Sequence, residues 1–308
     1  MTQQALDEKY MRRALYLARL GAGHVSPNPM VGALIAGPDG RIIGEGFHRR
    51  FGEGHAEVNA MASVKEEDLH LIQASTIYVT LEPCSHYGKT PPCAEMLCRQ
   101  RVRRCVIGTG DPNPKVSGRG VRMMREAGIE VTEDVLRDEC RALNKRFFTA
   151  QTKKRPWILL KWAEDDHGRM CMPDGTSLAI STPSTKALMH SERALCDAIL
   201  VGTDTLLNDN PTLTTRLWPG RSPRPVVFDS PRLSDPAVRS RLKVFSREPI
   251  ILDPVLPLEE NMKILFKDYG ITSLMVEGGR RLLDSFIREN LYDEMRVERV
   301  QKKALKIP

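Results

Sequence analysis

Apolar residues in the first half of the chain recur with a helical period at first and with strand periods afterwards. The runs VGALIA (31–36) and RIIGEGF (41–47) are separated by Gly-Pro-Asp-Gly, and this arrangement predicts a β-hairpin. Beyond the hairpin the two patterns alternate, which predicts an α/β domain with a mostly β-α-β-α order. Its later strands are expected at 76–81 and 104–109, and its helices at 55–64, 93–99 and 121–127.

A second alternation begins at the apolar run WILLKW (157–162), directly after the polar, basic segment TAQTKKRP (149–156). A polar segment that ends in proline is typical of a connection between domains. We therefore predict one domain over residues 1–148 and another over 156–308, with a linker at about 149–155. In the second domain we expect the strands AILVG, PVVFD, PIILD and SLMVEGG, helices near 184–194, 260–269 and 280–289, and loops between short strands in the Pro-rich part, 211–257.

Length and composition agree with two globular domains. The chain has 308 residues, about twice the usual ~150-residue domain. Its 41% hydrophobic and 28% charged residues argue against a disordered or fibrous protein. No apolar run approaches the ~18 residues of a membrane span, and the start, MTQQALDEKYMRR, lacks the apolar core of a secretory signal. We expect a cytoplasmic location and no membrane partner.

The net charge of +7 is compatible with nucleic acid, a membrane surface or phosphorylated small molecules as partners. The charge is spread evenly, because residues 1–150 hold 21 basic and 18 acidic side chains and residues 151–308 hold 25 and 21. The absence of a basic block favours anionic metabolites over nucleic acid. The seven cysteines are an odd number in a chain without an export signal, which argues against a disulfide framework.

Three short motifs carry the most specific chemistry. His55 and Glu57 open a predicted helix, Pro83-Cys84 ends a predicted strand, and Cys93 opens the next helix. One imidazole and two thiolates suit a tetrahedral Zn²⁺ with an open fourth position, which is typical of a catalytic site. The helix N-termini at His55 and Cys93 favour the thiolate forms. Glu57 can carry a proton from water to a leaving amino group, so the pattern predicts hydrolytic deamination, as in zinc nucleobase deaminases.

An alternative interpretation is that His55, Cys84 and Cys93 are ordinary core residues. Glu57, two residues after His55, and Pro83, directly before Cys84, favour the interpretation as a metal site. The other cysteines lack such a setting, and for them core packing is expected: Cys98, Cys105, Cys140, Cys171 and Cys196.

The spacing between the two cysteine ligands is distinctive. Eight residues, SHYGKTPP, separate Cys84 from Cys93, where the commonest deaminase pattern has only two. With SPNPMVGA (26–33), GFHRRFGEGHAE (46–57) and DPNPKVSGRG (111–120), this long loop resembles the deaminase half of the bifunctional riboflavin biosynthesis proteins. The resemblance implies a cytidine-deaminase-like αβα domain.

The same resemblance implies roles for individual residues of the first domain. His55, Cys84 and Cys93 would be the zinc ligands and Glu57 the proton carrier. An amide such as Asn28 can both donate to and accept from a pyrimidine edge, and Lys89 and His86 suit phosphate or ribose. On matching motif positions, the substrate-binding residues implied are Asn28, His48, His86, Lys89, Asp111 and Asn113.

The second half is less informative by itself. Val276-Glu277-Gly278-Gly279, between an apolar run and a helix, is typical of a strand-turn-helix that offers backbone N–H groups to phosphate, but a plain tight turn gives the same pattern. Asp209-Asn210-Pro211 also predicts a turn, and Arg193 and Arg216 could be solvated surface residues. No G-x-G-x-x-G follows a strand, so an ordinary Rossmann domain is not supported.

The segments 197–216 and 274–294 resemble the reductase half of the same family, a dihydrofolate-reductase-like α/β domain that uses NADPH. The resemblance implies hydride transfer to the ribosyl carbon of the substrate. The cofactor contacts that it implies are Ala163, Thr205, Asp209, Gly279, Arg280, Arg281, Leu282, Leu283, Asp284 and Ser285. The substrate contacts that it implies are Ser177, Arg193, Leu213, Arg216 and Glu277, with the arginines as partners for phosphate.

The sequence therefore predicts a homo-oligomeric enzyme for riboflavin biosynthesis that deaminates a phosphoribosylated diaminopyrimidinone at Zn²⁺ and then reduces its ribosyl group with NADPH. One alternative is a nucleic-acid base deaminase whose second half is a binding module. Another is a metal-stabilised scaffold without activity. The even charge, the SHYGKTPP loop and the DNPTLTTR and VEGG segments argue against the first, and Glu57 beside an open metal position argues against the second.

Overall fold

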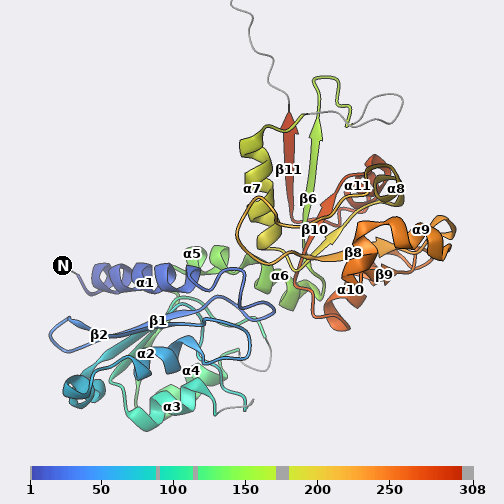
Figure 1. The fold of residues 1–308 in the computed structure, drawn as a ribbon. Helices are drawn as coiled ribbons and strands as arrows, with labels where there is room; N and C mark the ends of the chain where they lie inside the picture. Colours follow the sequence, from blue (N-terminus) through green and yellow to red (C-terminus); the bar gives the residue numbers. More distant parts are fainter. Residues whose placement is uncertain (1, 88–90, 114–116, 171–179, 300–308) are drawn as a thin grey trace, which may run out of the picture. The chain divides into compact units, whose positions relative to one another are not determined.

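The computed structural model describes residues 2–87, 91–113, 117–170 and 180–299 (Figure 1). The chain separates into two compact units, Met1–Thr152 and Lys153–Pro308. This division falls inside the segment expected to be a linker. That segment is largely helical, because helix α6 (Lys145–Lys153) runs through it with Phe148 and Ala150 buried.

The first unit is built on a five-stranded sheet in the order β2-β1-β3-β4-β5. The predicted hairpin is confirmed, since β1 (Gly32–Ala36) pairs antiparallel with β2 (Ile42–Phe47). β1 also pairs antiparallel with β3 (Thr76–Val79), whereas β3, β4 (Arg104–Ile107) and β5 (Glu130–Thr132) are parallel. Its remaining elements are α1 (Gln3–Arg19), α2 (Ala56–Ala62), the 3-10 helix η1 (Glu66–Ala74), α3 (Cys93–Gln100), α4 (Arg119–Glu126) and α5 (Arg137–Leu143).

Helices cover both faces of this sheet. Alternate strand residues point to opposite faces, so Ala33 and Ile35 pack with α2, α3 and α4, whereas Leu34 and Ala36 pack with α1 and α5. Both sets are almost completely buried. The result is the three-layer αβα arrangement expected from the sequence, and Figure 1 shows α1 on one side of the sheet and α2, α3 and α4 on the other.

The parallel pairing of β3 and β4 brings two distant loops together. The amide of Gly108 donates to the carbonyl of Val79, and the amide of Glu82 donates to the carbonyl of Thr109 at 2.9 Å. Because parallel neighbouring strands end at the same edge of a sheet, the loops that follow them emerge side by side. One loop carries Cys84 and the other carries Asp111.

The second unit contains a parallel six-stranded sheet in the order β11-β6-β10-β7-β8-β9. Strands β7, β9 and β10 and the first half of β6 are apolar runs because helices cover both faces, whereas the edge strand β11, EMRVER, is mostly charged. The strands are β6 (Trp157–Glu164), β7 (Ala198–Leu200), β8 (Arg224–Phe228), β9 (Ile250–Leu252), β10 (Ser273–Glu277) and β11 (Glu294–Arg299), and the α-helices are α7 (Pro183–Ala194), α8 (Thr203–Asp209), α9 (Pro236–Arg241), α10 (Leu258–Lys267) and α11 (Arg280–Arg288).

The Pro-rich part of the second unit was predicted to form loops between short strands, and the structure differs from this prediction. Besides β8 and β9 it contains α9 and two 3-10 helices, η2 (Pro231–Leu233) and η3 (Lys243–Arg247). The prolines start helices here rather than loops, since Pro231 and Pro236 occupy first-turn positions behind the capping residues Ser230 and Asp235. Among the described residues, no helix combines the length and apolar character that a membrane span requires.

Candidate functional site

His55 and Glu57 lie at the start of helix α2, which packs directly on strand β2. His55 is the residue before the first helical turn, and Glu57 is in that turn with only 3% of its surface exposed. The close approach depends on glycine, because a Cβ on Gly46 would lie 2.3 Å from the backbone nitrogen of Ala60. The glycine-rich strand therefore sets the depth at which α2 carries both functional side chains.

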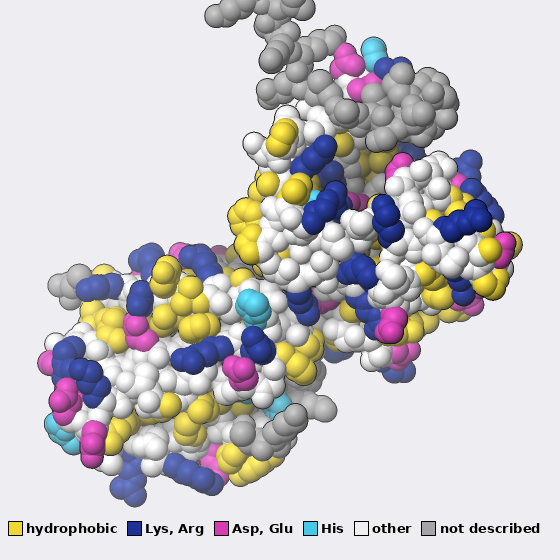
Figure 2. Space-filling view, viewed as in Figure 1, with side chains coloured by type: hydrophobic (Ala, Val, Ile, Leu, Met, Phe, Trp, Pro, Cys, Tyr) yellow, Lys and Arg dark blue, Asp and Glu magenta, His cyan; other side chains and the backbone are white. Residues whose placement is uncertain are grey.

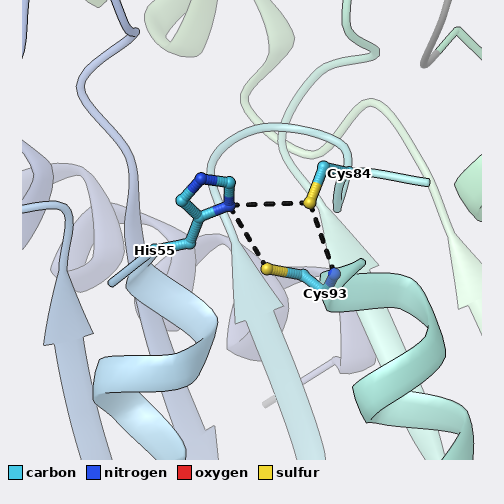
Figure 3. A group of neighbouring side chains, drawn as sticks. All are labelled: His55, Cys84 and Cys93. Carbon is cyan, nitrogen blue, oxygen red and sulfur yellow. Dashed lines mark hydrogen bonds between the residues drawn. The ribbon is translucent and has the colours of Figure 1, made fainter. Parts of the chain in front are cut away.

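Cys84 and Cys93 come from the other side of the same site. Cys84 follows β3, and Cys93 is the first residue of α3. The amide of Cys93 donates to Cys84 Sγ at 3.3 Å, and the amide of Ala94 donates to the carbonyl of Cys84 at 3.1 Å. These bonds hold the two ends of the long loop together at the N-terminus of α3 (Figure 3).

The three predicted ligand atoms have the separations that Zn²⁺ requires. His55 Nδ1 lies 3.5 Å from Cys84 Sγ and 3.4 Å from Cys93 Sγ, and all three atoms lie within 4.8 Å of one another (Figure 3). Tetrahedral zinc bonded at its usual N and S distances needs an N···S separation of about 3.6 Å. One borderline and two soft donors in this geometry fit Zn²⁺.

Burial and neighbouring side chains shift the pKa values of the titratable groups in the site. Hydrogen bonding with Cys93 and His55 holds the pKa of the Cys84 thiol well below its usual value, which favours the thiolate. The hydrogen bond with Cys84 raises the pKa of His55. Burial raises the pKa of Glu57 to about 7, and the neighbouring Cys84 acts in the same direction. A carboxyl group with a pKa near 7 can both accept and release a proton at neutral pH.

A cavity of about 330 Å³ adjoins these residues. His48, 3% exposed, is oriented by Gly54, whose carbonyl lies 3.1 Å from Nδ1, and its Nε2 lies 3.2 Å from Asn28 Nδ2. The Asp111 carboxylate accepts from the Asn113 amide at 2.7 Å, and burial raises the pKa of Asp111 to about 6. Of the residues predicted for this site, those lining the cavity are Asn28, His48, His55, Glu57, Cys84, His86, Asp111 and Asn113; Lys89 lies outside the described residues.

Sequence reasoning missed eight residues of the cavity wall, and three of them are Glu82, Phe147 and Gln151. Phe147 and Gln151 line it from α6, one turn apart on the same helix face. Gln151 was not predicted because residues 149–155 were interpreted as a linker, and no sequence motif singled out Phe147. Glu82 also lines the cavity, although its position directly before Pro83-Cys84 could have drawn attention to it.

A second cavity, of about 610 Å³, lies in the second unit. The turn after β10 borders this cavity. Gly278 and Gly279 in the turn have φ angles of 70° and 76°, which residues other than glycine rarely adopt. Of the predicted cofactor residues, those lining it are Thr205, Asp209, Gly279, Arg280, Arg281 and Leu282. Gly278, part of the turn that the sequence singled out, also lines it. Lining residues that the sequence did not indicate are Met170, Gly202, Thr203, Asp204, Asn208, Ser230 and Arg232.

The other predicted cofactor residues do not line this cavity. Leu283 is 1% exposed and packs in the core, because its position on α11 faces the sheet. Asp284 accepts from Arg280 on the helix surface, and the Ser285 hydroxyl donates to the carbonyl of Leu282. Ala163 lies in β6.

Two of the residues predicted to hold the reductase substrate bind each other. Arg193 Nε and Nη2 donate to the two carboxylate oxygens of Glu277 at 2.7 and 2.6 Å, and Arg193 Nη1 donates to the Thr214 carbonyl at 3.0 Å. Leu213 is buried, whereas Arg216 is exposed and donates to the Thr212 hydroxyl. Ser177 lies outside the described residues.

The sequence matches two family models. Residues 4–109 match the cytidine and deoxycytidylate deaminase zinc-binding region, and residues 156–299 match the RibD C-terminal domain. A riboflavin biosynthesis protein RibD of Aquifex aeolicus (strain VF5) is 38% identical over 310 residues, which cover 94% of this chain and 85% of the relative. The RibD protein of Escherichia coli (strain K12) is 37% identical over 320 residues, covering 94% and 86%.

A solved structure agrees with these relatives. The diaminohydroxyphosphoribosylaminopyrimidine deaminase/5-amino-6-(5-phosphoribosylamino)uracil reductase of Thermotoga maritima superimposes with a TM-score of 0.84 at 37% identity, covering 94% of this chain and 85% of that one. Fold, family models and relatives agree over both units. The chain belongs to the RibD family of riboflavin biosynthesis proteins, bifunctional enzymes in which a deaminase domain is followed by a reductase domain.

Proposed function

We propose that residues 1–148 bind Zn²⁺ and hydrolytically deaminate 2,5-diamino-6-ribosylamino-4(3H)-pyrimidinone 5′-phosphate. Residues 156–308 then reduce the ribosyl group of the product with NADPH, which gives 5-amino-6-(5-phosphoribitylamino)uracil. The observation that carries the proposal is the clustering of the His55, Cys84 and Cys93 ligand atoms beside a cavity that His55, Cys84 and Glu57 line together with Asn28 and Asp111.

In the deaminase site, Zn²⁺ held by His55, Cys84 and Cys93 would supply Lewis acidity for activating water. The Glu57 carboxylate accepts the proton of the attacking water and delivers it to the departing amino nitrogen, so ammonia leaves as water is consumed. Asn28 faces the pyrimidine edge with both a donor and an acceptor. His48 stays neutral because burial lowers its pKa, so it serves as a hydrogen-bonding group rather than a cation.

In the reductase site, NADPH would supply the hydride for the open-chain ribosyl carbon. Thr205, Asp209 and the turn at Gly279–Leu282 would hold the cofactor in the 610 Å³ cavity. The small residues at this turn leave its backbone amides accessible to phosphate groups. The Arg193–Glu277 pair and Arg216 would hold the phosphorylated substrate, as would the predicted contacts Leu213 and Ser177.

A coupled assay tests both steps. The purified protein, supplied with the diaminopyrimidinone phosphate and NADPH, should release ammonia and then oxidise NADPH in proportion. Glu57→Gln should abolish ammonia release while the chain retains zinc. Unchanged turnover in that variant would contradict the deaminase mechanism, and robust deamination without NADPH oxidation would contradict the reductase assignment.

The alternative of a nucleic-acid base deaminase has less support. On the face shown in Figure 2, Lys and Arg side chains are scattered over both units and interspersed with Asp and Glu. A nucleic-acid groove requires a continuous basic stripe instead. Single-stranded oligonucleotides in the ammonia assay would distinguish the two substrates.

We also propose that the enzyme is a cytoplasmic homo-oligomer. No disulfide joins the cysteines in the part of the chain that the structure describes, which agrees with a reducing compartment. Apolar side chains at the edge strand β11 and on α7 are exposed, with Met295 at 45% and Leu188 at 54%, and a second copy could cover them. Light scattering would give the molar mass, and cell fractionation the compartment.

A further inference from the structure

The carboxylate of Glu82 connects the two neighbouring loops, after β3 and after β4, that both contribute residues to the deaminase cavity. Glu82 lies between β3 and the ligand Cys84, and only 5% of its surface is exposed. Its Oε2 accepts from the amides of Gly118 at 3.0 Å and Asp111 at 3.4 Å. Its Oε1 accepts from the amides of Gly120 at 3.2 Å and Val121 at 3.5 Å.

These four bonds reach both ends of the segment between β4 and α4. Asp111 and Asn113 are at the first end, and Gly118 and Gly120 begin helix α4 at the second. The two ends are also joined by a backbone bond of 2.9 Å from the Ser117 amide to the Asn113 carbonyl. A single buried carboxylate therefore holds in place the loop that presents two residues of the cavity wall.

The surrounding backbone is built for this close approach. A Cβ on Gly120 would lie 2.3 Å from the carbonyl oxygen of Pro83 and 3.4 Å from Glu82 Oε1, so only glycine lets the start of α4 reach the carboxylate. The N-cap residue of α4 is Gly118, which has no side chain to accept from the first helical amides. Glu82 accepts from them instead, and a negative charge at a helix N-terminus is stabilising.

We propose that Glu82 is a positioning residue of the deaminase site, which holds the backbone at Asp111 and at the start of α4 so that Asp111 and Asn113 face the substrate. It does not bind the metal, because its two oxygens are occupied by backbone amides. The inference rests on the proposed deamination for its kinetic consequence, whereas the anchoring of the segment is independent of any substrate.

Glu82→Gln tests the proposal, because the variant keeps the shape of the side chain but replaces one acceptor oxygen with an NH₂ group that faces backbone N–H donors. We expect KM for deamination to rise about tenfold or more, with zinc content and kcat retained. The matched control is Asp68→Asn, a buried carboxylate of the same unit that pairs with Arg41 outside the cavity. An unchanged KM in Glu82→Gln, or loss of zinc in that variant, would overturn the assignment.

Hydrogen exchange gives a readout that does not need the substrate. In the unsubstituted protein the amides of Gly118, Gly120 and Val121 should be protected, and in Glu82→Gln they should exchange at least tenfold faster. Rapid exchange in the unsubstituted protein would overturn the proposal even if the variant fails to fold. If the unsubstituted protein releases no ammonia, the proposed function is wrong, and the exchange result still decides whether Glu82 anchors the segment.

A double-substitution cycle separates positioning from a general loss of stability. If Glu82 acts through Asp111, the rise in KM for the combined Glu82→Gln and Asp111→Asn variant is smaller than the product of the two single effects. If the rises in KM of the two single variants multiply in the combined variant, Glu82 acts independently of Asp111. That result would contradict the proposal.

Discussion

Asp7 and Arg104 form a buried, two-pronged ion pair in the first unit, although 97 positions separate them in the sequence. Both guanidinium Nη atoms donate to the carboxylate at 2.8 Å, and the side chains are 4% and 7% exposed. The pair fastens α1 to the start of β4, on the sheet face opposite to α2, α3 and α4. Tyr78 adds a third bond, since its hydroxyl donates to the same carboxylate at 2.9 Å.

Asp7→Asn should therefore destabilise the first unit by about 3–5 kcal/mol, because it removes the buried partner of the Arg104 charge and leaves only the exposed Glu130 carboxylate, 3.0 Å from Arg104 Nε. Glu8→Gln is the matched control. Glu8 pairs with Arg12 on the exposed face of the same helix, and its loss should cost below about 1 kcal/mol. Denaturant unfolding of the two variants measures the difference; similar midpoints would contradict the prediction.

The same pair predicts how stability depends on pH. Burial alone would raise the pKa of Asp7, but hydrogen bonds from Arg104, Gln3 and Tyr78 outweigh it and leave the pKa below its usual value. An acid whose pKa is lowered by folding stabilises the fold above its unfolded pKa of about 3.9, and that contribution is lost as pH falls through the folded pKa. The gap in unfolding free energy between the unsubstituted protein and Asp7→Asn should be constant at neutral pH and should narrow below about pH 4.

Replacing either cysteine ligand should remove the metal. Cys84→Ser and Cys93→Ser should each lower the zinc content well below one per chain and abolish deamination, because a hydroxyl is a poor substitute for a thiolate ligand. Cys98→Ser should retain zinc, since Cys98 Sγ bonds to the carbonyl of Met123 and lies outside the ligand set. Elemental analysis of the purified variants measures their zinc content. Full zinc occupancy in either ligand variant would show that the assigned set of zinc ligands is wrong.

Gly46→Ala should impair the deaminase through the position of a helix. The added Cβ would collide with the backbone of Ala60, so α2 must move away from β2 and carry His55 with it. We expect a loss of about 1–3 kcal/mol in stability together with weaker zinc binding, while NADPH oxidation persists when the deaminated product is supplied as substrate. Gly37→Ala is the control, because its Cβ would come closest to the carboxylate end of the Asp39 side chain, at 3.0 Å, and no nearer than 3.5 Å to the Arg41 carbonyl oxygen. Equal zinc affinity in both variants would contradict the prediction.

The Arg193–Glu277 pair should act as one unit in the reductase. Glu277→Gln and Arg193→Gln should each lower kcat/KM for NADPH oxidation, and the double variant should lose much less than the product of the two effects, because the partners are 13% and 14% exposed and bind each other. Deamination should be unaffected. Lys263→Gln, which removes an exposed pair on α10 of the same unit, should leave both activities unchanged. Independent effects of the two substitutions would contradict this coupling.

The sequence was most informative where function depends on residue types at short spacing. His55, Glu57, Pro83, Cys84 and Cys93 identify a metal site because each ligand sits at the start of a helix or at the end of a strand, and local patterns predict those boundaries. The alternating α/β order and the hairpin followed from the same local periodicity. The family resemblance then extended the interpretation to both halves of the chain, and the fold and the relatives support it.

Other properties depend on contacts between residues that are far apart in the sequence. The sequence does not show that Arg193 is paired with Glu277, that Leu283 faces the core, or that the supposed linker forms a helix lining the deaminase cavity. It also contains no local signal for Glu82 as the acceptor of four amides more than 25 positions away. The chemical identity of the ligands and their short spacings are encoded locally, whereas the partners of buried charges are chosen only when strands pair and helices pack, because burial requires each charge to find a partner wherever the fold brings one.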